Sequence, residues 1–531
     1  MKRIPLALLL VGAAASAQTS SVVPADPVAD AIHGHVAYLA SDALRGREAG
    51  TPDYDRAADY VASQFAAAGL KPAGDGGSYL QKVPLVRYEA VDDGHVAVVG
   101  KQDSVNLAPD KDYRIAAVAT AAKTHVSARV VFVGQGLDAS TLGYDDYATV
   151  DAKGAIVAFV DGAPDDLPSE ERAYFKSPAA KLRAAAAHGA IGAVQLSRGK
   201  TLAGPRGRGT TIWANLDGTG HSDTPGTALL ATFSDTGTAK LFNAAGLLWK
   251  KIGKPDKKGR YTPTEMPVTI TVESETRFAP LSSSNVVGVV PGSDPALKDE
   301  VVVLSAHLDH IGVSEKPDAK GDRINNGALD DAIGVASLIQ EARRFRSAPP
   351  PKRTIVFLAV TAEEKGLVGS SWFVRHRPKG LEDIVADVNL DMPVLTYRFS
   401  DLVAFGGDRS SLAPIIAHAA ASMGVTMAPD PIPDQAIFVR SDHFRFVEQG
   451  VPSVFLWPGL AGPGRAAFED FMKNRYHKEG DEVDAGILWD QAVRFVDINY
   501  RIAREIADAP TRPTWNTGDW FGDHFGHKIA Q

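Results

Sequence analysis

The sequence predicts an α/β fold, in which a mostly parallel mixed sheet is flanked by helices and a smaller β-rich α/β unit is inserted into the chain. Two observations support this prediction. From Ser284 onward, short apolar runs alternate with amphipathic stretches, which is typical of parallel strands joined by helices. Between about 115 and 275 the chain instead shows short apolar runs separated by loops rich in Gly and Thr, which indicates a separate unit.

The elements of the main layer follow from this alternation. Two amphipathic helices are expected between 30 and 83, with a Gly-punctuated loop between them. Strands are predicted at 285–290, 301–305, 354–360, 384–390, 402–405 and 451–457, and helices at 331–346, 368–376, 411–423 and 487–507. The tail 512–531 carries four aromatic residues, and its pattern leaves open whether it packs back on the domain.

The unit between 115 and 275 shows no catalytic pattern. Strands are predicted at 130–133, 155–160 and 191–196, an Ala-rich helix at 178–188 and a loop at 199–224. No His and acidic residues cluster here at a catalytic spacing. We therefore expect this unit to serve as a lid or a docking module.

Composition excludes several classes of protein. The 531 residues include 56 Lys and Arg against 64 Asp and Glu, a formal net charge of −8, so that no basic excess indicates nucleic-acid binding. With 44% hydrophobic and 23% charged residues the chain is neither disordered nor fibrous. The chain has no Cys, which excludes disulfides, iron–sulfur clusters and Cys nucleophiles. Any metal must therefore be bound by His, Asp and Glu.

The N-terminus predicts a targeting segment. Lys2 and Arg3 precede an apolar run from Ile4 to Ala15, and Ala15-Ser16-Ala17 resembles a cleavage site. Residues 1–17 are therefore predicted to be a bacterial signal peptide, and the protein to be exported to the periplasm or secreted. No later run is long and apolar enough to cross a bilayer, so no membrane anchor is expected.

Acidic and His residues follow the predicted strands of the main layer. In open α/β sheets, ligands bind beyond the carboxyl ends of the strands, so these residues are expected to share one rim. The group comprises His307, Asp330, Glu363, Glu364 and Asp391. Each lies directly after a strand, or at the start of a helix in the case of Asp330. The sequence thus predicts a metal site at this rim.

The residue types suit two divalent ions that share a carboxylate. Two His and three carboxylates would hold two zinc ions. The two ions carry a charge of +4 and the carboxylates −3, so one net positive charge remains, which makes a bound water more acidic. One carboxylate of the pair Glu363-Glu364 would remain free as a general base. Chemically, His310, His443 and His477 all compete for the second His position.

Six segments resemble a known family. AHLDH, NNGALDDAIG, FLAVTAEEKGLVGS, NLDM, SDHF and YHKEGDEVD occur in the order and spacing of the di-zinc exopeptidases, which include bacterial leucyl aminopeptidases, glutamate carboxypeptidase and, more distantly, glutaminyl cyclases. The resemblance implies the zinc exopeptidase fold (phosphorylase/hydrolase-like). It also implies a catalytic domain formed by 18–114 and 276–511, interrupted at 115–275 by a protease-associated domain.

The resemblance also implies roles for single residues. His307, Asp330 and Asp391 would hold one zinc ion, and Asp330, Glu364 and His477 a second. Glu363 would be the general acid–base, Tyr476 would stabilise the oxyanion, and Asp309 would orient His307 through its carboxylate. Asp331 follows the bridging residue, in the family often after a cis peptide bond. Ile333 departs from the pattern, because the family usually has a small residue there.

We therefore expect an aminopeptidase that hydrolyses the N-terminal residue of peptides with a zinc-activated water and Glu363 as base. Alternatives are a carboxypeptidase or dipeptidase, a glutaminyl cyclase with one zinc ion, and an inactive receptor-like protein. A carboxypeptidase would need an Arg fork for the substrate carboxylate, for which Arg440, Arg206 and Arg208 are candidates.

Overall fold

The computed structural model describes residues 26–100, 104–197, 202 and 209–526. Its main sheet is mixed and mostly parallel, as predicted. β14 (Glu300–His307) pairs in parallel with β15 (Thr354–Val360) and β16 (Asp383–Asn389), and β16 with β19 (Ser453–Pro458). β13 (Thr264–Val290) is antiparallel to β15, and β17 (Asp401–Phe405) to β19. The predicted fold class is confirmed.

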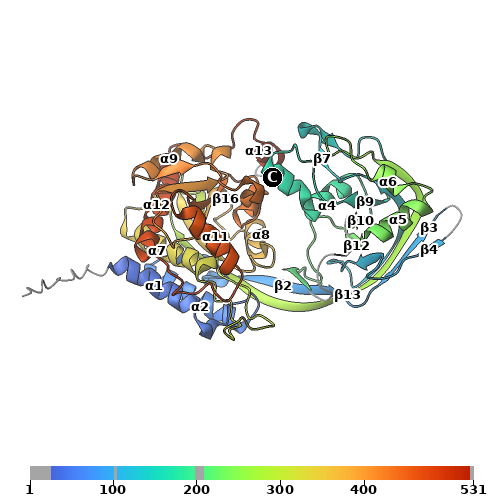
Figure 1. Ribbon diagram of the computed structural model, residues 1–531. Coiled ribbons are helices and arrows are strands. Elements are labelled where there is room, and N and C mark those ends of the chain that lie inside the picture. Colours follow the sequence, from blue (N-terminus) through green and yellow to red (C-terminus); the bar gives the residue numbers. More distant parts are fainter. Residues whose placement is uncertain (1–25, 101–103, 198–201, 203–208, 527–531) are drawn as a thin grey trace, which may run out of the picture.

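Helices cover both faces of this sheet (Figure 1). One face packs on α1 (Pro27–Leu39), α2 (Pro52–Ala68), α7 (Ile333–Ser347) and α12 (Trp489–Asp508), and the other on α8 (Val368–Arg375) and α10 (His443–Val447). The alternation along β14 explains this arrangement. Val302 and Leu304 belong to the apolar cluster of the first face, whereas Val301 and Val303 belong to that of the second.

Local sequence sets the ends of the helices. α2 begins after Thr51, whose hydroxyl accepts a hydrogen bond from the Tyr54 amide at 3.3 Å, and Pro52 occupies its first position. It ends at Gly69 with φ 80°, a left-handed conformation that suits Gly. Further elements of the main domain are α9 (Leu412–Ala421), β18 (Thr426–Ala428) and α11 (Gly464–Asn474).

A second set of strands forms the inserted unit, by which we mean the described residues between 95 and 275. Its elements are β3 (His95–Val99), β4 (Ser104–Asn106), β5 (Tyr113–Ile115), β6 (Lys123–Phe132), β7 (Asp138–Ala139), β8 (Tyr144–Asp145), β9 (Ile156–Val160), α3 (Ser169–Lys176), α4 (Pro178–Ala187), β10 (Gly192–Leu196), β12 (Leu229–Phe233), α5 (Asp235–Ala244) and α6 (Trp249–Ile252). The strands β6, β9, β10 and β12 pair in parallel, in that order. Because β3 and β5 join this set, it begins earlier in the chain than the predicted boundary at 115.

Two long strands connect the units (Figure 1). β2 (Leu80–Ala90) pairs with the second half of β13, whereas the first half of β13 pairs with β3 and β6. β11 (Thr210–Trp213) adds to the other edge of β2, although 199–224 was predicted to be a loop. That part of the prediction is wrong, because β-branched and aromatic residues at 210–213 favour a strand despite the Gly-rich surroundings.

The C-terminal tail packs between the two units. α13 (Trp520–Phe525) lies against α3, with Trp520 5.3 Å from the Tyr174 ring centroid, and against α10. Arg409 joins the same interface, since it pairs with Glu171 at 3.2 Å and with Asp519 at 2.8 Å. The tail therefore holds the inserted unit against the main domain.

The predicted signal peptide, 1–17, lies outside the described residues. Among the helices that the structure describes, none is long and apolar enough to cross a membrane.

Candidate metal centre

Three predicted ligands meet at the carboxyl ends of β14 and β16. His307 ends β14, Asp391 follows β16 and Asp330 lies in the irregular turn before α7. The Nε2 atom of His307 is 3.0 Å from Oδ1 of Asp330 and 3.3 Å from Oδ1 of Asp391, and all three side chains are buried. Their ligand atoms lie within 4.8 Å of one another.

The second carboxylate oxygen of Asp330 faces another group. The Nε2 atom of His477 is 3.4 Å from this Oδ2 and 3.2 Å from Oε2 of Glu364. His310, which is fully buried, places Nδ1 2.8 Å from Oε1 of Glu364, and its ligand atoms also group with those of Asp330 and Glu364. Two His residues therefore border this group, and the assignment of His477 rather than His310 stays a prediction.

The donor set fits metal ions. Oδ2 of Asp330 and Oε1 of Glu364 are buried and face the imidazole nitrogens of His477 and His310, but among the described residues they accept no hydrogen bond of suitable geometry. Buried carboxylates are normally paired or bound to a metal. Imidazole nitrogens and carboxylate oxygens at these positions are ligands that zinc accepts. His307 reflects the surrounding negative charge: although burial opposes it, Asp391 and Asp330 hold the pKa of this imidazole well above its usual value.

Asp331 ties three segments together. Its Oδ2 atom accepts from the His307 amide at 3.2 Å, and its Oδ1 atom accepts from the amides of Gly334 and Met392, both at 3.1 Å. The peptide bond between Asp330 and Asp331 is cis, as the resemblance implied. Asp331 thereby fixes the backbone at the end of β14, the start of α7 and the loop after β16.

Asp309 has a different role from the expected one. The Nδ1 atom of His307 contacts the Asp309 backbone carbonyl at 3.0 Å, so that the main chain and not the carboxylate orients this imidazole. The Asp309 carboxylate instead accepts from the backbone amides of Glu363 at 3.0 Å and Glu364 at 3.4 Å. The prediction was wrong because the sequence does not show whether the backbone carbonyl or the carboxylate of Asp309 faces His307. Asp309 anchors the loop that carries both Glu residues.

Two positioning residues escaped the sequence analysis. Asp481 accepts from the amides of Leu329 and Asp330, both at 3.0 Å. Arg47 is fully buried and donates to the carbonyls of Leu308 at 2.8 Å and Gly327 at 2.7 Å. Of these two residues, only Asp481 gave a signal in the sequence, because it lies within the segment YHKEGDEVD. Arg47 gave none, because it lies in the loop between the first two helices, far away in sequence.

A cavity of about 420 Å³ adjoins the metal ligands. Glu363 and Tyr476 line it, and burial raises the pKa of both side chains. Its apolar wall consists of Met392, Ile432, Ile437, Phe455, Trp457, Phe468 and Met472, and its polar wall includes Gln435, Arg440, Glu469 and Lys473. α11, which the sequence analysis missed, supplies four of these residues: Phe468, Glu469, Met472 and Lys473.

The remaining candidates are three Arg residues and His443, and the structure places only some of them beside the site. Arg440 lines the cavity, whereas Arg206 and Arg208 lie outside the described residues. His443 is fully buried between the rings of Phe438 and Phe455, each 5.4 Å away, and burial lowers its pKa to about 3. It belongs to neither ligand group.

Residues 285–503 match the family model described as peptidase family M28. This segment belongs to that family. Curated relatives include Aminopeptidase YwaD of Bacillus subtilis (28% identical over 227 residues, 40% of this chain and 45% of the relative) and a probable zinc metalloprotease of Pyricularia oryzae (41% over 264 residues, 45% and 50%). The chain spans less than two thirds of the length of these relatives.

Solved structures of similar fold include an aminopeptidase from Aneurinibacillus sp. strain AM-1. It has a TM-score of 0.48 at 20% identity and covers 93% of this chain and 97% of its own. A zinc aminopeptidase from Bacillus subtilis has a TM-score of 0.43 at 18% identity, over 91% and 96%.

One comparison corrects the sequence analysis. A vacuolar membrane protease of Lachancea thermotolerans is 33% identical over 133 residues, 25% of this chain and 12% of that protein, and one of Clavispora lusitaniae is 36% identical over 94 residues, 18% and 8%. The predicted periplasmic or secreted location is wrong by this comparison. A short apolar run after basic residues marks a targeting segment without identifying the compartment.

Proposed function

We propose that the protein is a zinc-dependent aminopeptidase that removes the N-terminal residue of peptides. The arrangement around Asp330 carries this proposal: one carboxylate oxygen faces His307 and the other faces His477, while Glu363 lines the adjoining cavity. Relatives named as an aminopeptidase and a zinc metalloprotease support it.

The proposed metal load is two zinc ions. His307, Asp330 and Asp391 would hold one ion, and Asp330, Glu364 and His477 the other. When bound, the ions would polarise the peptide carbonyl and make water more acidic.

Glu363 would move the protons of the reaction. It takes one from the attacking water and returns it to the nitrogen of the leaving amine, as the peptide C–N bond breaks. The Asp309 carboxylate holds the amide of Glu363 and so fixes the loop from which its side chain reaches the cavity. Tyr476 lines the same cavity and, because burial raises its pKa, keeps the phenolic proton that it donates to the oxyanion.

The cavity wall indicates the substrate. Phe455, Trp457 and Phe468 favour a large apolar side chain at the substrate N-terminus. The carboxylates of Glu363 and Asp391, which line the same cavity, would attract the free α-ammonium group of that residue.

Arg440 favours a second candidate function, a carboxypeptidase or dipeptidase. Arg440 lines the cavity, and among the described residues its guanidinium donates only to Gln435, with Nη1 3.4 Å from the backbone carbonyl and 3.3 Å from Oε1. The paired donors of Arg suit a substrate carboxylate.

A peptide panel distinguishes these functions. The purified protein is assayed on leucyl peptides that are free, N-acetylated or C-amidated, with and without a chelator and added zinc. An aminopeptidase cuts the amidated peptide and not the acetylated one, a carboxypeptidase does the reverse, and a dipeptidase cuts only the free dipeptide. Metal analysis tests the cyclase alternative, which needs one zinc ion per chain. If the protein binds two zinc ions but cuts none of the peptides, the result would support the receptor-like alternative.

The proposal that the inserted unit is a protease-associated domain rests on the sequence resemblance. A series of progressively shorter peptide substrates, compared by KM, tests whether this unit binds substrate residues far from the cleaved bond.

A further inference from the structure

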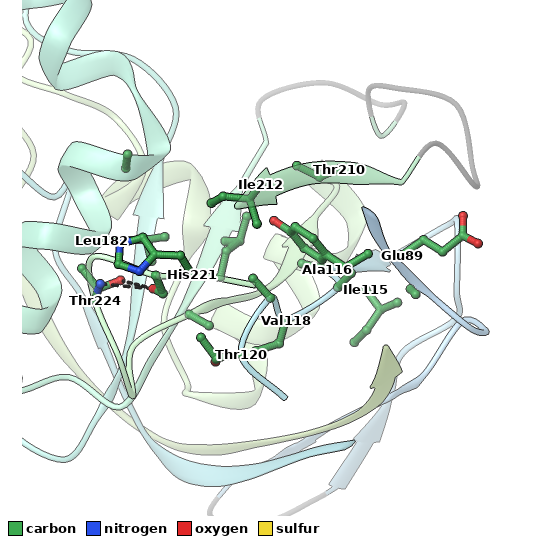
Figure 2. A pocket seen from close by; sticks show the side chains of 18 of the residues that line it. Glu89, Ile115, Ala116, Val118, Thr120, Leu182, Thr210, Ile212, His221 and Thr224 are labelled. Carbon is green, nitrogen blue, oxygen red and sulfur yellow. Dashed lines mark hydrogen bonds between the residues drawn. The ribbon is translucent and has the colours of Figure 1, made fainter. Parts of the chain in front are cut away.

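Residues 361–367, which carry Glu363 and Glu364 and are called the base loop below, separate two cavities. The base loop links β15 to α8, and Glu363 lines the catalytic cavity of about 420 Å³. Gly366 of the same loop and Val368, the first residue of α8, line a second cavity, of about 770 Å³, between the main domain and the inserted unit. Figure 2 shows the part of this second cavity that Val118, Leu182 and Ile212 of the inserted unit surround. A change on one side of the loop can therefore affect the other.

The inserted unit reaches this loop through a buried carboxylate. Glu448, directly after α10, has only 4% of its side chain exposed. Its Oε2 atom is 2.7 Å from Nη1 of Arg445, and its Oε1 atom is 2.9 Å from Nη2 of Arg183 on α4. Arg445 in turn donates from Nη2 to the Gly366 carbonyl at 3.1 Å. These contacts form an unbroken path from α4 to the base loop.

A second contact fixes Arg183 from the other side. Asp223 of the inserted unit is 3.4 Å from Arg183 and 2.9 Å from Arg375 on α8, the helix into which the base loop leads. The Arg183 guanidinium also lies over the Tyr174 ring, 5.7 Å from its centroid. Arg183 is therefore held where it neutralises Glu448, so that Arg445 remains available to the loop.

We propose that Arg183 is a positioning residue, through which the inserted unit holds Arg445 and thereby the loop that carries Glu363 and Glu364. The inference rests on the proposed role of Glu363. Without Arg183, the buried Glu448 carboxylate loses one of the two Arg residues with which it pairs here, and Arg445 shifts toward it and away from the Gly366 carbonyl. The loop then loses its tie at Gly366, while Asp309 still holds the amides of Glu363 and Glu364.

The matched control is Arg172 on α3. Arg172 also bridges the units, since it is 3.8 Å from Asp165 and 3.7 Å from Asp434, but it does not contact Glu448. Arg183→Gln should lower kcat about tenfold, as losses of outer supporting contacts do, with KM and zinc content within twofold of wild type. Arg172→Gln should leave kcat unchanged.

Hydrogen exchange provides a readout that does not depend on catalysis. In the metal-free proteins, Arg183→Gln should speed exchange of the amides in 361–368, and Arg172→Gln should not. Arg183→Lys, which keeps the charge, should recover most of kcat, and Arg183→Met replaces Arg183→Gln if that variant fails to fold. Unchanged kcat and exchange in Arg183→Gln, or in Arg183→Met in its place, would overturn the proposal.

A double-mutant cycle isolates the path through Glu448. If Arg183 acts through this carboxylate, Arg183→Gln combined with Glu448→Gln should be no slower than Glu448→Gln alone. Additive losses would refute the path. If Glu363→Gln retains full activity, the proposed function fails, and the exchange measurement still decides whether Arg183 holds the loop.

Discussion

Gly334, in the first turn of α7, is a position where one methyl group should disable the site. A Cβ built there would lie 2.2 Å from Oδ1 of Asp331 and 2.5 Å from the Leu390 carbonyl oxygen. Asp331 cannot yield easily, because its carboxylate holds the amides of His307, Gly334 and Met392. Gly334→Ala should therefore displace this carboxylate from at least one of its three donors.

The expected cost has two parts. Overpacking in a dense core costs about 1–3 kcal/mol. One or two buried amides left without a partner cost about 1–3 kcal/mol each. Together these predict a loss of about 2–9 kcal/mol in the free energy of unfolding. Zinc affinity should fall by about 10–100-fold, because the segments that carry His307 and Asp391 shift.

Gly34 in α1 is the matched control. Its built Cβ meets nothing within 4 Å, and its φ is not positive, so Gly34→Ala should stabilise the helix by about 0.5–1 kcal/mol. Urea unfolding followed by circular dichroism, and zinc titration of the chelator-treated protein, measure both effects. Wild-type stability and zinc affinity in Gly334→Ala would refute the reasoning, since they would show that Asp331 does not set the geometry of the site.

Three further predictions concern single side chains. Glu363→Gln keeps the size of the side chain and removes the proton acceptor, so zinc should remain bound while turnover falls by about 10²–10⁴-fold; turnover near wild type would exclude Glu363 as the base. His477→Ala should lower the zinc content, His443→Ala should leave two ions in place, and a larger loss in His310→Ala than in His477→Ala would transfer the ligand role to His310. Glu341 is fully buried without a hydrogen bond among the described residues, and burial raises its pKa well above 4.5. The stability that the protonated Glu341 contributes is therefore present below about pH 4.5 and is lost as the pH rises toward its folded-state pKa. Glu341→Met should stabilise the protein by about 1–3 kcal/mol at pH 8 and by less at pH 4. Thermal melting across this pH range measures the difference.

Much of the main layer could be predicted because its strands are buried on both faces. The strand predicted at 354–360 is β15 as observed, and the helix predicted at 368–376 is α8 within one residue. α11 was missed because Pro463, which precedes it, provides no side-chain cap and the segment 459–464 is rich in Gly and Pro. This helix nevertheless supplies Phe468 and Glu469 to the cavity.

The sequence by itself determined the fold class and predicted that the candidate ligands lie together, because the carboxyl ends of parallel strands must share one rim. His307 ends such a strand, and Glu364 and Asp391 follow others. Only the tertiary structure decided which groups hold these residues in place. It assigned the Asp309 carboxylate to the base loop, brought His310 beside Glu364, and joined Arg183 to Glu448 across 265 residues. Such contacts depend on side-chain direction and on the packing of distant segments, which no local pattern of residues records.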